Sequence, residues 1–479
     1  MTLADLAALL PLIVLSATAV VVMVVIAFHR NHLLTAGLTG LGLVVALITL
    51  PLAASTGARQ VTALLIVDGY ALFYMGLLFA ASFAVAALAY GYLEGQGGTH
   101  EEFYILLLLA TLGAAVLVAS SHFASFFLGL EILSVSLYTL IAYPRWRRQS
   151  IEAGIKYLIL AAASAAFLLF GMALVYAELG TMEFAGIASL RATGGPASSA
   201  LLLTGLGMLI VGIGFKLAVV PFHLWTPDVY EGAPAPVTAF VATVSKGGMF
   251  ALLLRFFTQV DIRAYGSLFL VFALIAVVSM LFGNLLALLQ SNVKRILAYS
   301  SIAHLGYLLV AFLTSGALAV TAVTFYLVAY FVTTLGAFGV ISALSGRERE
   351  ADTMEDYRGL FWRRPWLAAI LATTLFSLAG IPLTAGFVGK FYILAAGVGS
   401  ALWSLVIILV IASAIGLFYY LRIIVVMYLP PPVEEEGLAA PSLPLASSLV
   451  LAVLLLFLIW FGVYPTPLID LIQATARLT

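Results

Sequence analysis

The sequence contains no cysteine and few charged residues. Of its 479 residues 9% are charged, and 21 basic side chains balance 21 acidic ones. Without thiolates the chain cannot ligate an iron–sulfur cluster or attach a c-type haem, so any electrons in its chemistry travel in another subunit. Soluble domains carry roughly 25% charged residues, which excludes a soluble globular fold. We expect no nucleic acid partner.

Nucleotide and hydrolase motifs are also missing. No Walker sequence, HExxH or G-x-S-x-G occurs. The run GLGMLIVGIG contains G-x-G spacings, but it lies inside an apolar stretch with no strand before it, so a dinucleotide-binding fold is excluded.

Long apolar runs fill the chain instead. Hydrophobic residues make up 64% of it, and most runs are long enough to cross a bilayer core of about 30 Å. Since lipid cannot satisfy backbone polar groups, these runs must be helices. The sequence predicts an all-α polytopic membrane protein, one domain over 1–479, with about 14 transmembrane helices. The runs lie at 5–27, 33–54, 65–93, 103–120, 123–142, 151–177, 200–226, 233–256, 268–289, 296–313, 316–345, 366–395, 401–428 and 444–465.

The loop charges predict the orientation of these spans. Most loop arginines and lysines, among them Arg145, Arg147 and Arg148, fall in connections on one side. The positive-inside rule then places both termini on the outer side. The first run lacks a basic n-region and a cleavage site, so we expect a span and not a signal peptide. The absence of a transit sequence favours a bacterial inner membrane.

Four charges lie deep within predicted spans: Glu131, Lys216, Lys246 and Lys390. A charge at the bilayer centre costs roughly 2.5–3.5 kcal/mol on insertion scales. An ion or proton path would explain them, with the lysines exchanging protons along a relay. Structural ion pairs are the alternative, but three lysines and one glutamate cannot pair off evenly.

Other polar residues in or near the spans are open to two interpretations. His304 is either a proton carrier or a core histidine with satisfied ring nitrogens. His223, just beyond Pro221, is a candidate for the lining of an inner entrance. Arg255 and Arg422 lie near span ends, where their head groups are expected to reach the membrane surface. Asp68 is expected to cap a helix.

Two spans are interrupted by glycine and proline next to a lysine. They are VGIGFKLAVVPFHLW (211–225) and SLAGIPLTAGFVGKFYIL (377–394). Paired breaks of this kind point to a transporter site, because irregular backbone at membrane depth must line protein or water. The breaks fall in spans 7 and 12, an odd number of spans apart, which predicts inverted repeats. The expected parts are three N-terminal helices (1–100), a first five-helix repeat of spans 4–8 (103–256), a second of spans 9–13 (268–428), and a last helix with its tail (444–479).

Three segments carry a family resemblance. HLWTPDVYEGAPAPVTAF (223–240), SNVKRILAYSSIAHLGY (291–307) and SLAGIPLTAGFVGKFY (377–392) closely resemble the antiporter-like membrane subunits of respiratory complex I, the NADH:quinone oxidoreductase. The resemblance covers nearly the whole chain. The P-D-V-Y-E-G-A-P-A-P-V run and the lysine at the second break are similar to the N-type branch of that family.

The resemblance implies roles for the deep charges. Glu131 would tune the proton affinity of Lys216, Lys246 would connect the two halves, and Lys390 would face the outer exit. Protons would enter near His223. The resemblance also implies other complex I membrane subunits and the lipid bilayer as partners. It implies no cofactor in this chain, with FMN, iron–sulfur clusters and quinone in other subunits.

Two alternative functions stay open at this point. A subunit of a Mrp-type monovalent cation/proton antiporter would share the family but be powered by ion gradients. A structural spacer of the membrane arm would need none of the four charges for transport.

Overall fold

The computed structural model is almost entirely helical. It describes residues 2–192, 199–260, 266–314, 317–346, 349–431 and 444–475, so the last four residues of the expected tail lie outside the described part. In that part, one two-stranded antiparallel sheet joins β1 (Arg59–Gln60) to β2 (Ile66–Val67).

The helices follow the expected apolar runs, since each run has the length and composition that a spanning helix requires. In chain order they are α1 (Leu3–Ala8), α2 (Leu10–Phe28), α3 (His32–Ala54), α4 (Gly69–Glu94), α5 (Glu102–Ala119), α6 (Phe123–Ile141), α7 (Arg148–Leu179), α8 (Phe184–Ala192), α9 (Ala200–Leu217), α10 (Trp225–Gly232), α11 (Ala235–Phe240), the π-helical turn η1 (Val241–Ser245), α12 (Lys246–Val260), α13 (Gly266–Leu288), α14 (Val293–Phe312), α15 (Ala317–Leu344), the 3-10 turn η3 (Met354–Tyr357), α16 (Leu360–Arg363), α17 (Pro365–Ala379), α18 (Ala385–Gly399), α19 (Trp403–Tyr428), α20 (Leu445–Val463) and α21 (Thr466–Thr475).

Within the described residues, 13 helical stretches are long and apolar enough to cross a membrane. The two shorter apolar helices α17 and α18 together supply one more span, interrupted at its middle. The prediction of an all-α polytopic protein with about 14 spans is therefore confirmed.

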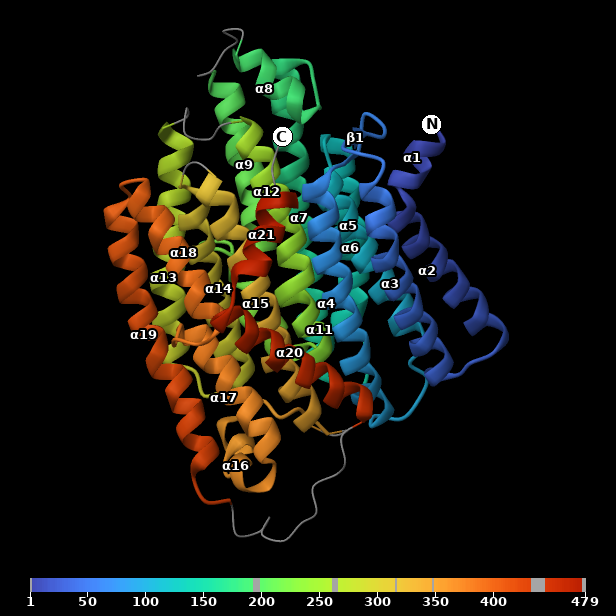
Figure 1. Cartoon of the computed structure of the whole chain (residues 1–479), viewed down its shortest axis with the longest axis vertical. Coiled ribbons are helices and arrows are strands. Elements are labelled where there is room, and N and C mark those ends of the chain that lie inside the picture. The colour runs from blue at the N-terminus through green and yellow to red at the C-terminus, as the bar shows by residue number, and fades with distance from the viewer. Residues whose placement is uncertain are drawn as a thin grey trace.

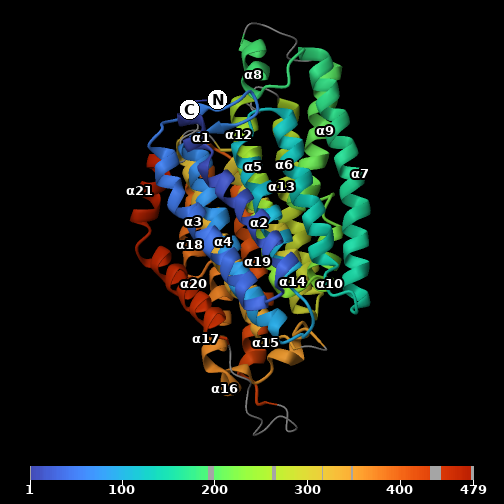
Figure 2. The same ribbon diagram turned by 90° about the vertical axis from the view of Figure 1, so that its right-hand side faces the viewer.

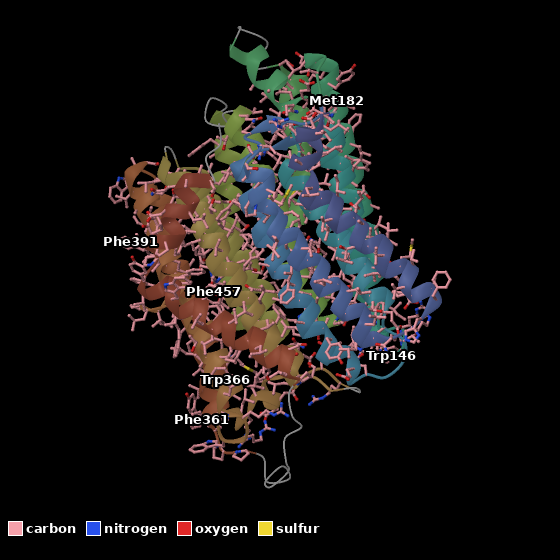
Figure 3. All side chains as sticks on the ribbon, turned by 45° about the vertical axis from the view of Figure 1, so that its right-hand side comes forward. Trp146, Met182, Phe361, Trp366, Phe391 and Phe457 are labelled. Atoms are coloured by element: carbon pink, nitrogen blue, oxygen red, sulfur yellow. The ribbon has the colours of Figure 1, made fainter. Side chains whose placement is uncertain are left out.

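The spans pack side by side along the long axis of the molecule (Figure 1). The N-terminal helices α2 and α3 lie at one side of the bundle and α19 at the other (Figure 1). Helices α1 and α21 lie toward the same end in both ribbon views (Figures 1 and 2). Trp146, Trp366 and Phe361 lie toward the opposite end (Figure 3). The first and the last described helix thus lie toward one end of the bundle, as an even number of spans requires.

The first interruption falls directly after Lys216. Helix α9 ends at Leu217, and Ala218 takes a left-handed conformation with φ 61°. Backbone groups freed by the break find partners at once: the amide of Val220 donates to Ser279 Oγ at 2.9 Å. The indole of Trp225 donates to the carbonyl of Phe215 at 2.9 Å. These bonds let a broken helix exist where water is scarce.

The second interruption separates α17 from α18. Gly380 ends α17 with φ 86°, a conformation that side chains with a Cβ rarely adopt. The chain runs from α9 toward α10 in one direction and from α17 toward α18 in the other (Figure 2). Breaks in spans 7 and 12 are therefore confirmed, and their opposite directions are what an inverted repeat requires.

The most deeply buried spans are α11–α12, α14 and α15. Their apolar side chains pack in the middle of the bundle, and the polar side chains among them have no access to water at the surface. The contacts between buried polar side chains, which the sequence did not predict, therefore lie mainly in the core of the bundle.

Candidate proton path through the membrane

Lys216 is buried at the last turn of α9, beside the first break. Its ammonium donates to Ser134 Oγ on α6 and to the hydroxyl of Tyr157 on α7, each at 3.0 Å. It also lies 5.6 Å from the centre of the Tyr157 ring. This lysine is held by neutral oxygens and has no counter-ion in direct contact, an arrangement that does not stabilise its charge as an ion pair would.

Glu131 lies one helical turn before Ser134 on α6 and is half-buried. Residues three apart on a helix share a face, so Glu131 points to the same side as the serine that holds Lys216. No ion pair within 4.0 Å joins Glu131 and Lys216, both of which are described. The carboxylate and the ammonium are therefore neighbours in an open arrangement. Its role in tuning Lys216 stays a prediction.

Lys246 is buried at the start of α12, directly after the π-helical turn η1. Its ammonium donates to Ser301 Oγ on α14 at 2.7 Å and lies 5.3 Å from the centre of the Tyr230 ring. The hydroxyl of Tyr330 donates to the same Ser301 oxygen, also at 2.7 Å. Such π-turns are frequent at functional sites, and this one places the ammonium of Lys246 against α14.

His304 lies one turn beyond Ser301 on α14 and is buried. Its Nδ1 lies 2.6 Å from the hydroxyl of Tyr326, and its Nε2 lies 3.1 Å from that of Tyr420. The ring centre is 5.7 Å from that of Tyr330. Both ring nitrogens have partners that can donate or accept, so the histidine is satisfied and can also pass a proton.

Lys390 is buried on α18, beyond the second break. Its ammonium donates to the carbonyls of Leu378 at 2.8 Å and Ala379 at 2.9 Å, and to Ser413 Oγ at 2.8 Å. The break frees these carbonyls, as the sequence suggested for such sites. The ammonium also lies 5.3 Å from the centre of the Tyr307 ring. A cavity of about 280 Å³ opens beside it between α18 and α19.

Several buried polar side chains lie between Lys246 and Lys390, and the sequence interpretation missed them. They form a stripe on α14, with further hydroxyls from α15 and α19, and they are Ser300, Ser301, Tyr307, Tyr326, Tyr330 and Tyr420. The signal that could have found them is a run of polar positions at helical spacing inside apolar spans.

A second, strongly polar cavity of about 250 Å³ lies between the start of α7 and α10. Asp228 pairs there with Lys156 at 2.7 Å and with Arg295 at 2.9 Å. Arg295 also pairs with Glu231 at 2.7 Å. Lys156 therefore belongs to a partly exposed ion-pair group beside α10, the helix that follows the first break.

His223 lies in the segment between α9 and α10 and is buried. Its Nδ1 has no hydrogen-bond partner among the residues that the structure describes. It is not one of the residues lining the polar cavity. A role of His223 in an inner entrance stays a prediction.

The expectation for Arg255 is wrong. Instead of reaching the membrane surface, its side chain is 1% exposed and forms two bonds of 2.8 Å with the carboxylate of Asp68, which is 4% exposed. Asp68 also caps α4 by accepting from the amide of Ala71, as expected. Arginine forms such paired bonds because its guanidinium is planar, and the pair replaces water for both charges. Arg422 donates to the carbonyls of Leu288 and Gln290.

Two broken spans that bury lysines, with buried polar side chains in the helices that pack between them, define an antiporter-like membrane protein. Residues 120–416 match the family of NADH:quinone oxidoreductase and Mrp antiporter transmembrane subunits. The chain belongs to this family.

Individual relatives agree with that assignment. NADH-quinone oxidoreductase subunit N of Ectopseudomonas mendocina (strain ymp) is 51% identical over 481 residues, which cover 98% of this chain and 96% of that protein. A chain of respiratory complex I from Thermus thermophilus, solved with bound aureothin, is 32% identical with a TM-score of 0.81, covering 96% of this chain and 98% of that one. A chain of the Mrp complex from Dietzia sp. DQ12-45-1b shares the fold, with 20% identity, a TM-score of 0.85 and coverage of 99% and 97%.

Replacing Ser301 with alanine tests the contact of Lys246. The change removes the hydroxyl that accepts a hydrogen bond from the ammonium of Lys246. Loss of this bond is expected to raise the activation barrier by about 1 kcal/mol, which lowers turnover of the complex about fivefold. Ser301→Thr keeps the hydroxyl and is expected to stay near wild type. Turnover is measured in membranes normalised to the amount of complex. Equal rates for the alanine and threonine variants would contradict a role for the hydroxyl.

Proposed function

We propose that this chain is the N-type proton-translocating membrane subunit of a bacterial NADH:quinone oxidoreductase. The observation that carries the proposal is the set of three buried lysines, each held by hydroxyl groups at or near a break or a π-helical turn, with His304 and its tyrosine partners buried on the same helix as the serine that binds Lys246. The relative at 51% identity, named as subunit N of that enzyme, supports the same assignment.

The proposed path begins at the inner end. A proton enters near His223 and the polar cavity and loads the region of Lys216 and Lys246. When the pair of Glu131 and Lys216 opens, Lys216 loses the carboxylate that stabilises its charge and releases the proton.

The second half of the path leads outward. From Lys246 the proton moves through Ser301 and the tyrosine hydroxyls around His304 to Lys390. Closing the pair of Glu131 and Lys216 restores the proton affinity of Lys216, so that the proton on Lys390 does not return and leaves on the outer side. Proton transfer between hydroxyl and imidazole groups within hydrogen-bond distance supports such a relay.

The energy for the cycle would come from quinone reduction in other subunits. FMN, iron–sulfur clusters and quinone would be bound there, since this chain has no cysteine to hold a cluster. The conformational signal would reach this chain through neighbouring membrane subunits and move the open pair.

The proposed setting is a bacterial inner membrane with both termini on the outer side, which the distribution of loop arginines supports. The two inverted repeats would cover 103–256 and 268–428, between the three N-terminal helices and the last helix with its tail. The two breaks that run in opposite directions support this division.

Purification of the tagged chain in mild detergent tests the assignment. We expect NADH:quinone activity, bound flavin and the signals of iron–sulfur clusters to purify with it, and an untagged strain is the control. Purification with sodium/proton exchange but without NADH oxidation would overturn the proposal in favour of a Mrp-type antiporter.

A further inference from the structure

Glu350 is a buried carboxylate outside the path described above. It follows α15, is 8% exposed, and accepts hydrogen bonds from four other parts of the chain that are far from it in sequence. Tyr92 of α4 donates from its hydroxyl at 2.5 Å, and Arg147 donates from Nη1 at 3.1 Å. Lys294, at the start of α14, forms an ion pair with the other carboxylate oxygen and is 0% exposed.

Glu350 and Lys294 lie on the two sides of the corner between α10 and α11. The ammonium of Lys294 donates to the carbonyls of Glu231 at 2.9 Å and Ala233 at 2.6 Å, at the end of α10. The carboxylate of Glu350 accepts from the amide of Ala235, the first residue of α11, at 3.2 Å. A cation at a helix end and an anion at the next helix start satisfy groups that the helices leave unpaired. The ion pair therefore holds the corner.

The same two elements meet again at the proton path. Lys294 and Ser301 lie seven residues apart on α14, so they share one face of that helix. Ser301 accepts a hydrogen bond from the ammonium of Lys246. Lys246 ends the segment that begins at Ala235, where Glu350 and Lys294 bind the corner. The segment from Ala235 to Lys246 is thus held at both ends, at its start by Glu350, which is paired with Lys294 of α14, and at its end by Ser301 of α14. We expect a shift at the start of this segment to move its end.

We propose that Glu350 is a positioning residue for the proton path, which fixes the corner at Ala235 through Lys294 and thereby places Lys246 on Ser301. The proposal rests on the proposed function. Glu350 itself transfers no proton and contacts none of the four deep charges assigned from the sequence. Because Tyr92 and Arg147 bind the same carboxylate, Glu350 also ties this corner to the N-terminal helices and to the loop before α7.

Glu350→Gln keeps the shape and removes the charge. We expect an assembled complex whose turnover and proton uptake fall about fivefold, the equivalent of about 1 kcal/mol in the barrier. Glu350→Asp keeps the carboxylate and should retain at least about half of the wild-type rate. Glu355→Gln is the matched control, because that acid lies five residues away and is 77% exposed, and it should behave as wild type.

A double-mutant cycle with Ser301→Ala separates positioning from general stability. If Glu350 acts by placing Lys246 on Ser301, Glu350→Gln changes the rate less than about twofold once the serine hydroxyl is gone. Multiplicative losses in the double variant would overturn the proposal, as would a wild-type rate for Glu350→Gln. If Glu350→Gln does not assemble, the cycle is run with Lys294→Gln, which removes the other charge of the ion pair, and is judged by the same rule.

The outcome for this proposal is distinguishable from that for the proposed function. If the chain moves no protons, Lys216→Ala leaves proton uptake unchanged along with every Glu350 variant. If only the positioning role is wrong, Lys216→Ala stops proton uptake while Glu350→Gln and Ser301→Ala act independently.

Discussion

Asparagine in place of Asp68 is expected to lower the free energy of unfolding by about 3–5 kcal/mol, because it leaves a buried guanidinium without its counter-charge. Arg255 is 1% exposed, and both of its bonds of 2.8 Å go to this carboxylate. The pair joins α12 to the start of α4, so its loss is expected to loosen the packing between these two helices. The expected readout is less assembled complex in membranes and a lower melting temperature in detergent.

Two further variants define this effect. Asp68→Asn combined with Arg255→Met removes both charges and is expected to recover a large part of the lost stability, since no buried charge is then left unpaired. Asp5→Asn breaks the partly exposed pair of Asp5 with Arg59 at 2.9 Å and is expected to have a smaller effect. Equal losses for Asp68→Asn and Asp5→Asn would show that burial of the pair contributes nothing.

Sequence patterns predicted the spans and both breaks because these depend on local chemistry. Apolar runs must form helices in lipid, and glycine or proline at membrane depth interrupts them. Lys216, Lys246 and Lys390 stood out for the same reason, since an isolated charge in an apolar run is visible without a structure. The structure confirms that these three lysines are buried, while their roles stay predictions.

Contacts between distant parts of the chain could not be predicted in this way. Glu350 looks like an ordinary loop acid, yet its partner Tyr92 is 258 positions away. The pair of Asp68 and Arg255 spans 187 positions, which is why a position near a span end suggested exposure for Arg255 and proved misleading. A local sequence pattern identifies a residue and its neighbours along the chain, whereas its contacts with distant residues depend on how the helices pack.

The arrangement of Glu131 and Lys216 can be tested directly. The carboxylate lies on the side of α6 that carries Ser134, the serine that binds Lys216 of α9, but it forms no ion pair with that lysine; the ammonium is held by Ser134 and Tyr157 instead. A lysine that alternates between a carboxylate and neutral oxygens changes its affinity for a proton on each change of partner. That alternation is what the proposed cycle requires of this position.

Lys216→Ala is therefore expected to lower turnover and proton uptake at least about tenfold, or at least about 1.4 kcal/mol in the barrier, without loss of the complex. The variant removes the group that takes and releases the proton beside the first break. Lys216→Arg is the discriminating control. Its guanidinium keeps the positive charge but does not release a proton in proteins, so it should fail as a carrier although it can serve as a structural charge.

The most direct measurement records NADH oxidation and proton uptake together in inverted membrane vesicles that carry wild type, Lys216→Ala or Lys216→Arg, after the amount of assembled complex has been equalised. The rate of NADH oxidation and the rate of proton uptake are both expected to fall in both variants. Normal rates in the alanine variant, or recovery by arginine, would contradict a proton-carrying role of Lys216 and identify it as a structural charge in a spacer subunit.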